Sequence, residues 1–208
     1  MNLKHIFIAL SLSASLISCD KDETPQATAS INVIHASPDA PGVDLLVDNA
    51  KVNAAALNFP EATGYLKIFA GTRNIKVNAT GTNNSVINAN LTFTADKYYS
   101  VFACNQLASI GAIVVEDNLT VPATGQSHIR FFHLSPNAPA VTVGTLSGAT
   151  FTPVFANRSF ETQATASANQ NFTPVPAGTY TFDVQANGTS VLTLPGIVLQ
   201  AGKIYTVF

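Results

Sequence analysis

A ten-residue phrase that occurs twice constrains the fold of this 208-residue chain more than any other feature. The phrase reads HASPDAPGVD from His35 and HLSPNAPAVT from His133. Two further matches follow in the same order, AGT with AGT and ADKYYSVF with AGKIYTVF. Three ordered matches predict two tandem domains of one fold. The offset between copies grows from 98 to about 107 positions, which predicts a loop insertion near residues 164–170 of the second copy.

Short segments rich in Val, Ile, Phe, Tyr and Thr alternate with Gly, Pro, Asn and Asp, and no segment has a convincing helical period. This spacing predicts an all-β fold. In residues 43–48 (VDLLVD) Val43, Leu45 and Val47 fall on one strand face, and both aspartates fall on the other. We therefore expect two antiparallel β-sandwiches, at residues 29–118 and 128–208, with a linker at 119–127.

Two tyrosines favour an immunoglobulin-like class for both tandem β-sandwiches. Each lies in a pattern Ala-x-Lys-x-Tyr-x-Val, which resembles the tyrosine corner, where a tyrosine opening a strand bonds back to the preceding loop. Tyr99 and Tyr205 are the candidates. The alternative is a plain buried strand tyrosine, and the all-β prediction holds in either case.

Residues 1–18 are expected to be a signal peptide rather than part of the fold. A short cationic start precedes an apolar run of about a dozen residues, too short to span a bilayer. The run ends in LISC, which resembles the bacterial lipobox and makes Cys19 the predicted lipidation site. Residues 19–28 would then be a flexible tether. The alternative is an ordinary secretory signal with an incidental cysteine.

A charged cluster follows the predicted lipidation site and comprises Asp20, Lys21, Asp22 and Glu23. It resembles the export signal of Bacteroidetes lipoproteins that are displayed on the cell surface, although it is also a solvated start to a tether. Two or three acyl chains hold a protein stably in a membrane. We expect an outer-membrane protein, anchored through its N-terminal lipid and facing outward.

Charge argues against a nucleic-acid-binding protein, and cysteine content argues against a fold held together by disulfide bonds. Loss of Lys4 with the signal peptide leaves 9 basic residues against 12 acidic, a formal charge of −3, so no basic face is available for nucleic acid. With Cys19 acylated, Cys104 has no disulfide partner and is expected to be a packing residue. The sequence contains no phosphate-cradling glycine loop, and no cofactor is expected.

Three segments, VIHASPDAPGVDLLVDNAKV, GYLKIFAGTRNIKV and YYSVF, resemble the bacterial domain of unknown function 4397. That family occurs singly or in tandem in secreted and lipid-anchored proteins. The first copy fits along nearly its whole length, whereas the second has Asn137 and Thr142 in place of Asp39 and Asp44. The resemblance implies an immunoglobulin-like sandwich in the cell envelope, and it implies no catalytic residues.

The repeated phrase can be interpreted as a hydrolytic site or as a turn. His35 and Ser37 point the same way on an extended segment, but a serine nucleophile also needs a third group to orient its base. The acid of the first copy becomes Asn137, while the Ser-Pro and Ala-Pro frame persists. Serine hydroxyls and prolines are turn-forming groups. We therefore favour a turn with inward histidines that bond loop carbonyls. Its residues are His35, Ser37, Pro38, Pro41, His133, Ser135, Pro136 and Pro139.

Metal and sugar sites have weak support. Zinc requires three or four ligands, and each copy repeats a single histidine. Asp39, Asp44 and Asp48 are weak calcium candidates, because their spacing fits no familiar calcium loop and the last two are expected to be solvated. The chain has no Trp, the usual sugar platform, and Tyr65 could be exposed or could pack at a strand entry.

The second copy is expected to lack its final strand. In the first copy residues 110–115 form the expected last strand, whereas the second ends at Phe208, inside the segment that matches YYSVF. Either the chain shown is truncated, or another chain supplies the strand, as in donor-strand assembly.

These features predict a non-catalytic, lipid-anchored module that binds or presents a protein or glycan partner at the bacterial surface. One alternative is a structural subunit that accepts a donor strand in its second domain. A hydrolase that uses His35 and Ser37 is the other.

Overall fold

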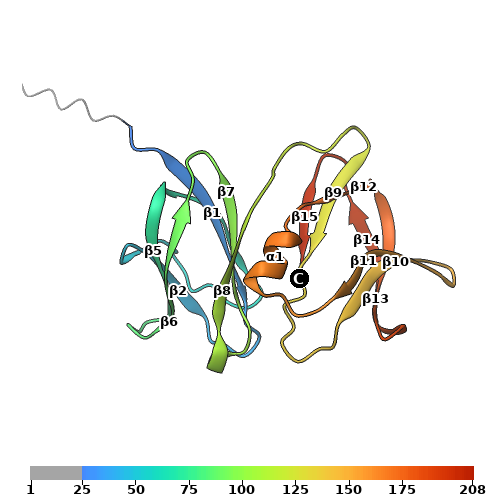
Figure 1. Ribbon diagram of the computed structural model, residues 1–208, viewed down its shortest axis with the longest axis horizontal. Helices are drawn as coiled ribbons and strands as arrows, with labels where there is room; N and C mark the ends of the chain where they lie inside the picture. The colour runs from blue at the N-terminus through green and yellow to red at the C-terminus, as the bar shows by residue number, and fades with distance from the viewer. Residues whose placement is uncertain (1–24) are drawn as a thin grey trace, which may run out of the picture.

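The computed structural model describes residues 25–208, which form two β-sandwiches side by side (Figure 1). The predicted all-β sandwich fold is confirmed. The predicted signal peptide, Cys19 and the charged cluster Asp20–Glu23 lie outside the described residues. Within residues 25–208, no helix has the length and apolar character needed to cross a membrane.

The first sandwich has two four-stranded sheets, ordered β4-β1-β7-β8 and β3-β2-β5-β6. Its elements are β1 (Thr28–Ala36), β2 (Val43–Val47), β3 (Ala50–Lys51), β4 (Ala62–Phe69), β5 (Gly71–Ala79), β6 (Ser85–Phe93), β7 (Tyr98–Cys104), a 3-10 turn (Leu107–Ser109) and β8 (Gly111–Glu116). The chain crosses from one sheet to the other several times, and side chains of both sheets form one core.

Within residues 25–208 the second sandwich has the same strand order with one strand fewer, in sheets β12-β9-β15 and β11-β10-β13-β14. Its elements are β9 (Gln126–Phe131), β10 (Val141–Ser147), β11 (Thr150–Arg158), α1 (Gln163–Ala168), β12 (Thr173–Pro176), β13 (Gly178–Ala186), β14 (Thr189–Leu199) and β15 (Ile204–Val207). The connection between the sandwiches runs over residues 117–125, slightly earlier than the predicted linker.

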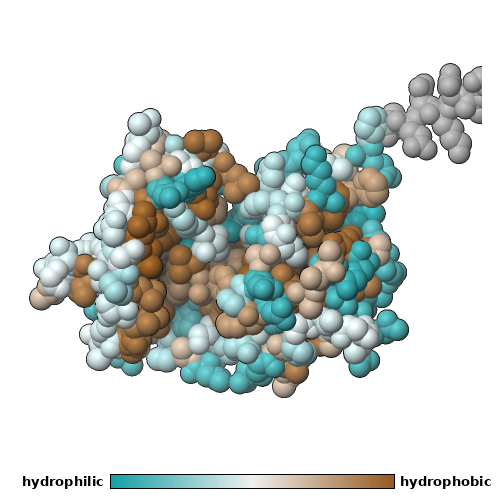
Figure 2. All heavy atoms as spheres, turned by 180° about the vertical axis from the view of Figure 1, so that it is seen from behind, coloured by the Kyte–Doolittle hydropathy of each residue, from teal (hydrophilic) through white to brown (hydrophobic). Residues whose placement is uncertain are grey.

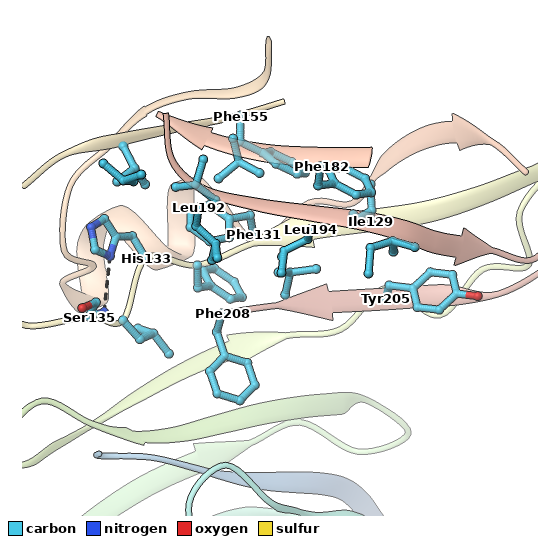
Figure 3. A pocket seen from close by; sticks show the side chains of 18 of the residues that line it. Ile129, Phe131, His133, Ser135, Phe155, Phe182, Leu192, Leu194, Tyr205 and Phe208 are labelled. Carbon is cyan, nitrogen blue, oxygen red and sulfur yellow. Dashed lines mark hydrogen bonds between the residues drawn. The ribbon is translucent and has the colours of Figure 1, made fainter. Parts of the chain in front are cut away.

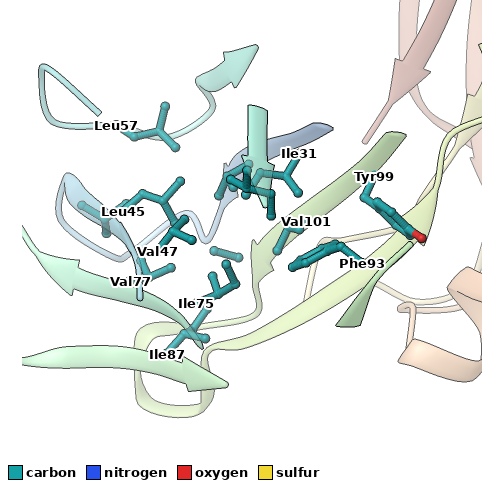
Figure 4. Packing of buried hydrophobic residues seen from close by; sticks show 14 of the residues in the cluster. Ile31, Leu45, Val47, Leu57, Ile75, Val77, Ile87, Phe93, Tyr99 and Val101 are labelled. Atoms are coloured by element: carbon teal, nitrogen blue, oxygen red, sulfur yellow. The ribbon is translucent and has the colours of Figure 1, made fainter. Parts of the chain in front are cut away.

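Alternate residues of facing strands fill the core of the first sandwich (Figure 4). Ile31 of β1, Leu45 of β2 and Ile75 of β5 are all fully buried. The apolar face predicted for residues 43–47 therefore points inward. Burial of each such side chain stabilises the fold by about 1.5–3 kcal/mol.

Two-residue turns set the register of two hairpins. Asp48 and Asn49 join β2 to β3 with φ of 49° and 68°, and Asn187 and Gly188 join β13 to β14 with φ of 50° and 77°. Two consecutive positive φ values are typical of type I′ turns, which Asn, Asp and Gly favour. Asp48, predicted as a strand residue, therefore lies in a turn.

The sequence led us to expect antiparallel pairs throughout, but one strand pair in each sandwich is parallel. β1 pairs in parallel with β7, where Ile31 lies opposite Tyr99, and β9 pairs in parallel with β15, where Ile129 lies opposite Tyr205. Parallel neighbours require a long crossover, which here contains the opposite sheet. An alternating pattern identifies a strand but not its partner.

The insertion near residues 164–170, predicted as a loop, contains helix α1. Thr162 caps the helix, since its hydroxyl accepts the Thr165 N–H at 3.2 Å and its own N–H donates to the Thr165 hydroxyl at 2.8 Å. This reciprocal pair is a capping box. A six-residue helix is too short to show a helical period in the sequence.

Candidate functional site

The first copy of the repeated phrase forms a hydrogen-bonded turn around a buried histidine. The His35 Nε2 atom lies 3.0 Å from the Pro41 carbonyl oxygen, and the Ser37 N–H donates to Nδ1 at 3.4 Å. Because a carbonyl oxygen only accepts, Nε2 carries the proton and Nδ1 is the acceptor. Pro38 lies in the turn itself, and Pro41 leads directly into β2.

The second copy repeats this geometry. The His133 Nε2 atom lies 3.0 Å from the Pro139 carbonyl oxygen, and the Ser135 N–H donates to Nδ1 at 3.3 Å. Pro136 again occupies the turn. In both sandwiches, therefore, the histidine uses both ring nitrogens to hold loop backbone.

The serine hydroxyl of the first turn faces a carboxylate rather than the imidazole. Ser37 Oγ donates to Asp39 Oδ1 at 3.4 Å, and the same oxygen accepts the Leu107 N–H at 2.8 Å. Asp39 thus ties the turn to the 3-10 segment that follows β7. Since both nitrogens of His35 are engaged by backbone, this arrangement gives Ser37 no base and does not suit hydrolysis.

The other two calcium candidates have separate partners. Asp44 is buried, in contrast to our expectation, and pairs with Lys51 at 2.8 Å while accepting the Gly81 N–H at 3.1 Å. Asp48 accepts the Asn74 N–H at 2.9 Å. The bond from Lys51 lowers the pKa of Asp44, and the bond from Asn74 lowers that of Asp48. No group of three or more His, Cys, Asp or Glu suited to a metal occurs in residues 25–208.

Each candidate corner tyrosine accepts a hydrogen bond from the loop before its strand. The Thr94 N–H donates to the Tyr99 hydroxyl at 3.1 Å, and the Gln200 N–H donates to the Tyr205 hydroxyl at 2.9 Å. Both bonds span five residues. The two sandwiches therefore start β7 and β15 in the same way.

A buried ion pair joins the two sandwiches. Arg130 of β9 contacts Asp117, which follows β8, with 2.6 Å between Nη2 and Oδ1 and side-chain exposures of 1% and 0%. The second oxygen of Asp117 accepts the Tyr65 hydroxyl at 2.6 Å and the Ser100 hydroxyl at 2.7 Å. Burial and the bond to Asp117 raise the pKa of Tyr65. The Tyr65 ring is exposed, but its hydroxyl belongs to this network.

Further groups surround the guanidinium of Arg130. Its Nε donates to the Thr206 hydroxyl at 2.9 Å, and its central carbon lies 4.4 Å from the Phe172 ring centroid and 5.0 Å from that of Phe132. Aromatic faces attract such a cation. The buried guanidinium therefore contacts a counter-ion, a hydroxyl acceptor and two aromatic faces.

An apolar cluster between the sandwiches lies beside this ion pair. The rings of Phe102 and Phe132 meet edge to face at 5.2 Å, and Cys104 packs in the same cluster. Burial raises the pKa of Cys104 to about 11. The thiol therefore stays protonated and unreactive at neutral pH.

The insertion of the second sandwich covers the free edge of β8. The Gln163 side-chain amide donates to the Val114 carbonyl at 2.6 Å, and its oxygen accepts the Val114 N–H at 2.8 Å. Gln170 accepts the Glu116 N–H at 3.1 Å. An unpaired edge is open to pairing with other chains, and these side chains close it.

The second sandwich contains an open apolar cavity of about 460 Å³ between its two sheets (Figure 3). Its side chains include Phe131, Phe182, Leu192, Leu194 and Phe208. Exposed hydrophobic residues gather on this sandwich, which forms the left half of the view in Figure 2. An exposed apolar surface of this kind marks a binding site or an incomplete core.

A family model described as "Domain of unknown function (DUF4397)" matches residues 29–144, more than half of the chain. The chain belongs to this family. The match covers the first sandwich and extends into β10 of the second. No curated protein matches the chain. A leucine-rich repeat protein of known structure from Bacteroides thetaiotaomicron VPI-5482 aligns with 12% identity and a TM-score of 0.19, over 87% of this chain and 25% of that one. This chain thus spans about a quarter of that protein's length.

Sequence reasoning missed the residues that join this DUF4397 domain to the second sandwich. Arg130 offered one signal, since it is a lone charge within the apolar strand segment IRFFH, where the first copy has Asn32. A charge in such a strand requires a buried partner. Asp117 and Gln163 lie in polar segments and offered no comparable signal.

Proposed function

We propose that this DUF4397 protein is a non-catalytic module that binds or presents a protein or glycan partner at the bacterial surface. Cys19 carries the lipid that anchors it in the outer membrane, and the residues between Cys19 and β1, which begins at Thr28, form the tether. The second sandwich acts as a second copy of the family domain, supported by the matching histidine turns and strand order.

The observation that carries this proposal is the use of the repeated motif. Both ring nitrogens of His35 and of His133 bond to loop backbone. The motif therefore holds the loops in shape, and neither histidine has a ring nitrogen free to activate the nearby serine as a general base. Loops held on a rigid scaffold are the usual place for binding residues. The buried pair of Arg130 and Asp117 supports presentation of both sandwiches as one unit.

Lipid labelling and protease treatment of intact cells test the proposal. The full-length chain is expected to incorporate labelled fatty acid and to be digested by protease added outside the cells. Cys19→Ala should lose the label and leave the membrane fraction, whereas Cys104→Ala, the matched control, should keep both. Replacing residues 20–23 with alanine should preserve the label and abolish digestion. A wild-type chain that is digested only after the cells are permeabilised would contradict surface presentation.

A further inference from the structure

We propose that the partner of this protein is a neutral oligosaccharide bound in a polar cleft between the two sandwiches, a step that rests on the proposed function. The cleft has a volume of about 690 Å³ and is lined by residues 96–98, 116–120 and 170–171. None of these three segments belongs to β14 or β15. Ligand pockets of this size occur preferentially where two domains meet.

The insertion of the second sandwich supplies one wall of the cleft. Gln170 and Asn171 follow helix α1, in a stretch that has no counterpart in the first copy. The Gln170 side-chain oxygen accepts the Glu116 N–H at 3.1 Å, and its carbonyl accepts Nη1 of Arg130 at 3.3 Å. These bonds hold the wall against the first sandwich, so both sandwiches contribute to one site.

An exposed tyrosine of the first sandwich supplies an aromatic ring. Tyr98 is 42% exposed, although it opens strand β7. Its ring meets the ring of Tyr65 edge to face at 5.2 Å, and the Tyr65 hydroxyl is held by Asp117. The Asp117 N–H also donates to the Tyr98 carbonyl at 2.8 Å. The ring is therefore held in place while part of it stays open, as packing against the C–H groups of a sugar requires.

The cleft also presents amide groups that have no partner within residues 25–208. Asn118 Oδ1 accepts the N–H of Thr120 at 3.0 Å and its hydroxyl at 2.6 Å, which leaves the Asn118 Nδ2 group to donate elsewhere. Gln170 uses its side-chain oxygen and keeps its amide nitrogen, and the side chain of Asn171 makes no hydrogen bond there. Amide side chains offer both donors and an acceptor, which is what sugar hydroxyls need.

The charges around the cleft favour a neutral ligand. Among the residues that line the cleft, Lys97 is the one basic residue, and it pairs with Glu116 at 2.7 Å. Asp96 adds a carboxylate that has no ion-pair partner in the described part of the chain, while Asp117 is paired with Arg130. An anionic ligand would therefore be repelled. An apolar ligand would bury the amide groups without partners, which is costly.

Isothermal titration calorimetry tests the ligand class. The full-length chain is titrated with short neutral oligosaccharides of glucose, galactose, mannose and xylose, and at least one is expected to bind saturably. Oligosaccharides of galacturonic acid should bind more weakly, because their carboxylates meet a negative cleft. Absence of binding by every neutral oligosaccharide, or tighter binding of the acidic ones, would overturn the proposed class.

Aromatic variants test the location. Tyr98→Ala should weaken binding by about tenfold or more, because it removes the ring that packs on the sugar. Tyr98→Phe keeps the ring and should retain most of the affinity. Phe69→Ala removes another exposed aromatic side chain, on β4 and outside the lining of the cleft, and should leave binding unchanged. Undiminished binding by Tyr98→Ala would place the sugar elsewhere and overturn the cleft.

An amide variant tests the second wall without disturbing the fold. Asn171→Ala should weaken binding by about three- to tenfold, as expected for the loss of one or two hydrogen bonds. Its urea unfolding should not change, because the Asn171 side chain makes no hydrogen bond within residues 25–208. Asn83→Ala, at an exposed position between β5 and β6, is the matched control and should change neither quantity. Equal affinities of the two variants would overturn the role of the insertion.

These results and the cell-surface tests can fail separately. A chain that is digested on intact cells but binds no neutral oligosaccharide would overturn the sugar site and leave surface presentation standing. A chain that binds an oligosaccharide through Tyr98 and Asn171, yet resists digestion on intact cells, would support the sugar site and contradict surface presentation.

Discussion

Arg130 carries a full positive charge at a position that is 1% exposed, and its environment is built to tolerate that charge. Removing an ion from water costs several kcal/mol, which is offset only by a close counter-ion and additional hydrogen bonds. Asp117 supplies the counter-ion, while Thr206 and two aromatic rings complete the shell. A single substitution that leaves Asp117 buried and unpaired should therefore be costly.

We predict that Arg130→Met lowers the free energy of unfolding by about 3–5 kcal/mol, because it strands the Asp117 carboxylate. Urea denaturation measures the change. Adding Asp117→Leu to the first variant should restore part of the loss. Arg73→Met breaks an exposed ion pair with Asp48 and should cost less than about 1 kcal/mol. Equal losses for Arg73→Met and Arg130→Met would show that the buried pair has no special role.

Residues whose partners are close in sequence were the ones that sequence reasoning could place. His35 bonds a carbonyl six positions away, within the repeated phrase that suggested an inward histidine. The network of Asp117 reaches Tyr65, 52 positions away, and Arg130 in the other sandwich. Those contacts depend on how the sandwiches meet, which neither pattern nor spacing encodes.

At the scale of elements, strand positions followed from alternation, but helix α1 and its role did not. Its six residues are too few to show a period, and its function lies in two side-chain contacts with a strand of the other sandwich. The Gln163 amide presents one donor and one acceptor to Val114, as a neighbouring strand would. The parallel pairing of β1 with β7 was equally invisible, since strand partners are set by the crossover.

We predict that Gln163→Ala accelerates hydrogen exchange at the Val114 amide by about five- to tenfold, because it removes the bond that protects this amide. The overall stability should fall by about 1 kcal/mol, as expected for two partly exposed hydrogen bonds. Gln163→Glu keeps the acceptor but repels the Val114 carbonyl, so it should also lower stability. Gln106→Ala changes an exposed glutamine near the other end of β8 and should alter neither quantity. Unchanged exchange at Val114 in Gln163→Ala would contradict the edge-capping role.

At the scale of the whole molecule, the interface determines whether the two sandwiches unfold together. Residues of β1, β7 and β8 meet Phe132, Leu134 and Ala166 in one apolar cluster, next to the buried ion pair. Helix α1 of the second sandwich also bonds β8 of the first through Gln163, so the two sandwiches share buried apolar surface, an ion pair and hydrogen bonds. We therefore expect the intact chain to unfold in a single transition.

Ala166 offers a way to separate the two sandwiches without touching either inner core. It is fully buried on the face of α1 that meets the first sandwich, whereas Ala164 lies exposed on the same helix. Ala166→Asp places a carboxylate in the apolar cluster, a change that costs several kcal/mol unless the sandwiches part. We predict that calorimetry then shows two transitions, one for each sandwich. Opening should also expose Cys104, whose pKa would fall from about 11 toward its usual value of 9.0, so its alkylation, followed by peptide mapping, should accelerate. Ala164→Asp, the control, should unfold in one transition, and the alkylation of Cys104 should stay as slow as in the unchanged protein. A single unchanged transition in Ala166→Asp would mean that the sandwiches are coupled through the ion pair rather than through the cluster.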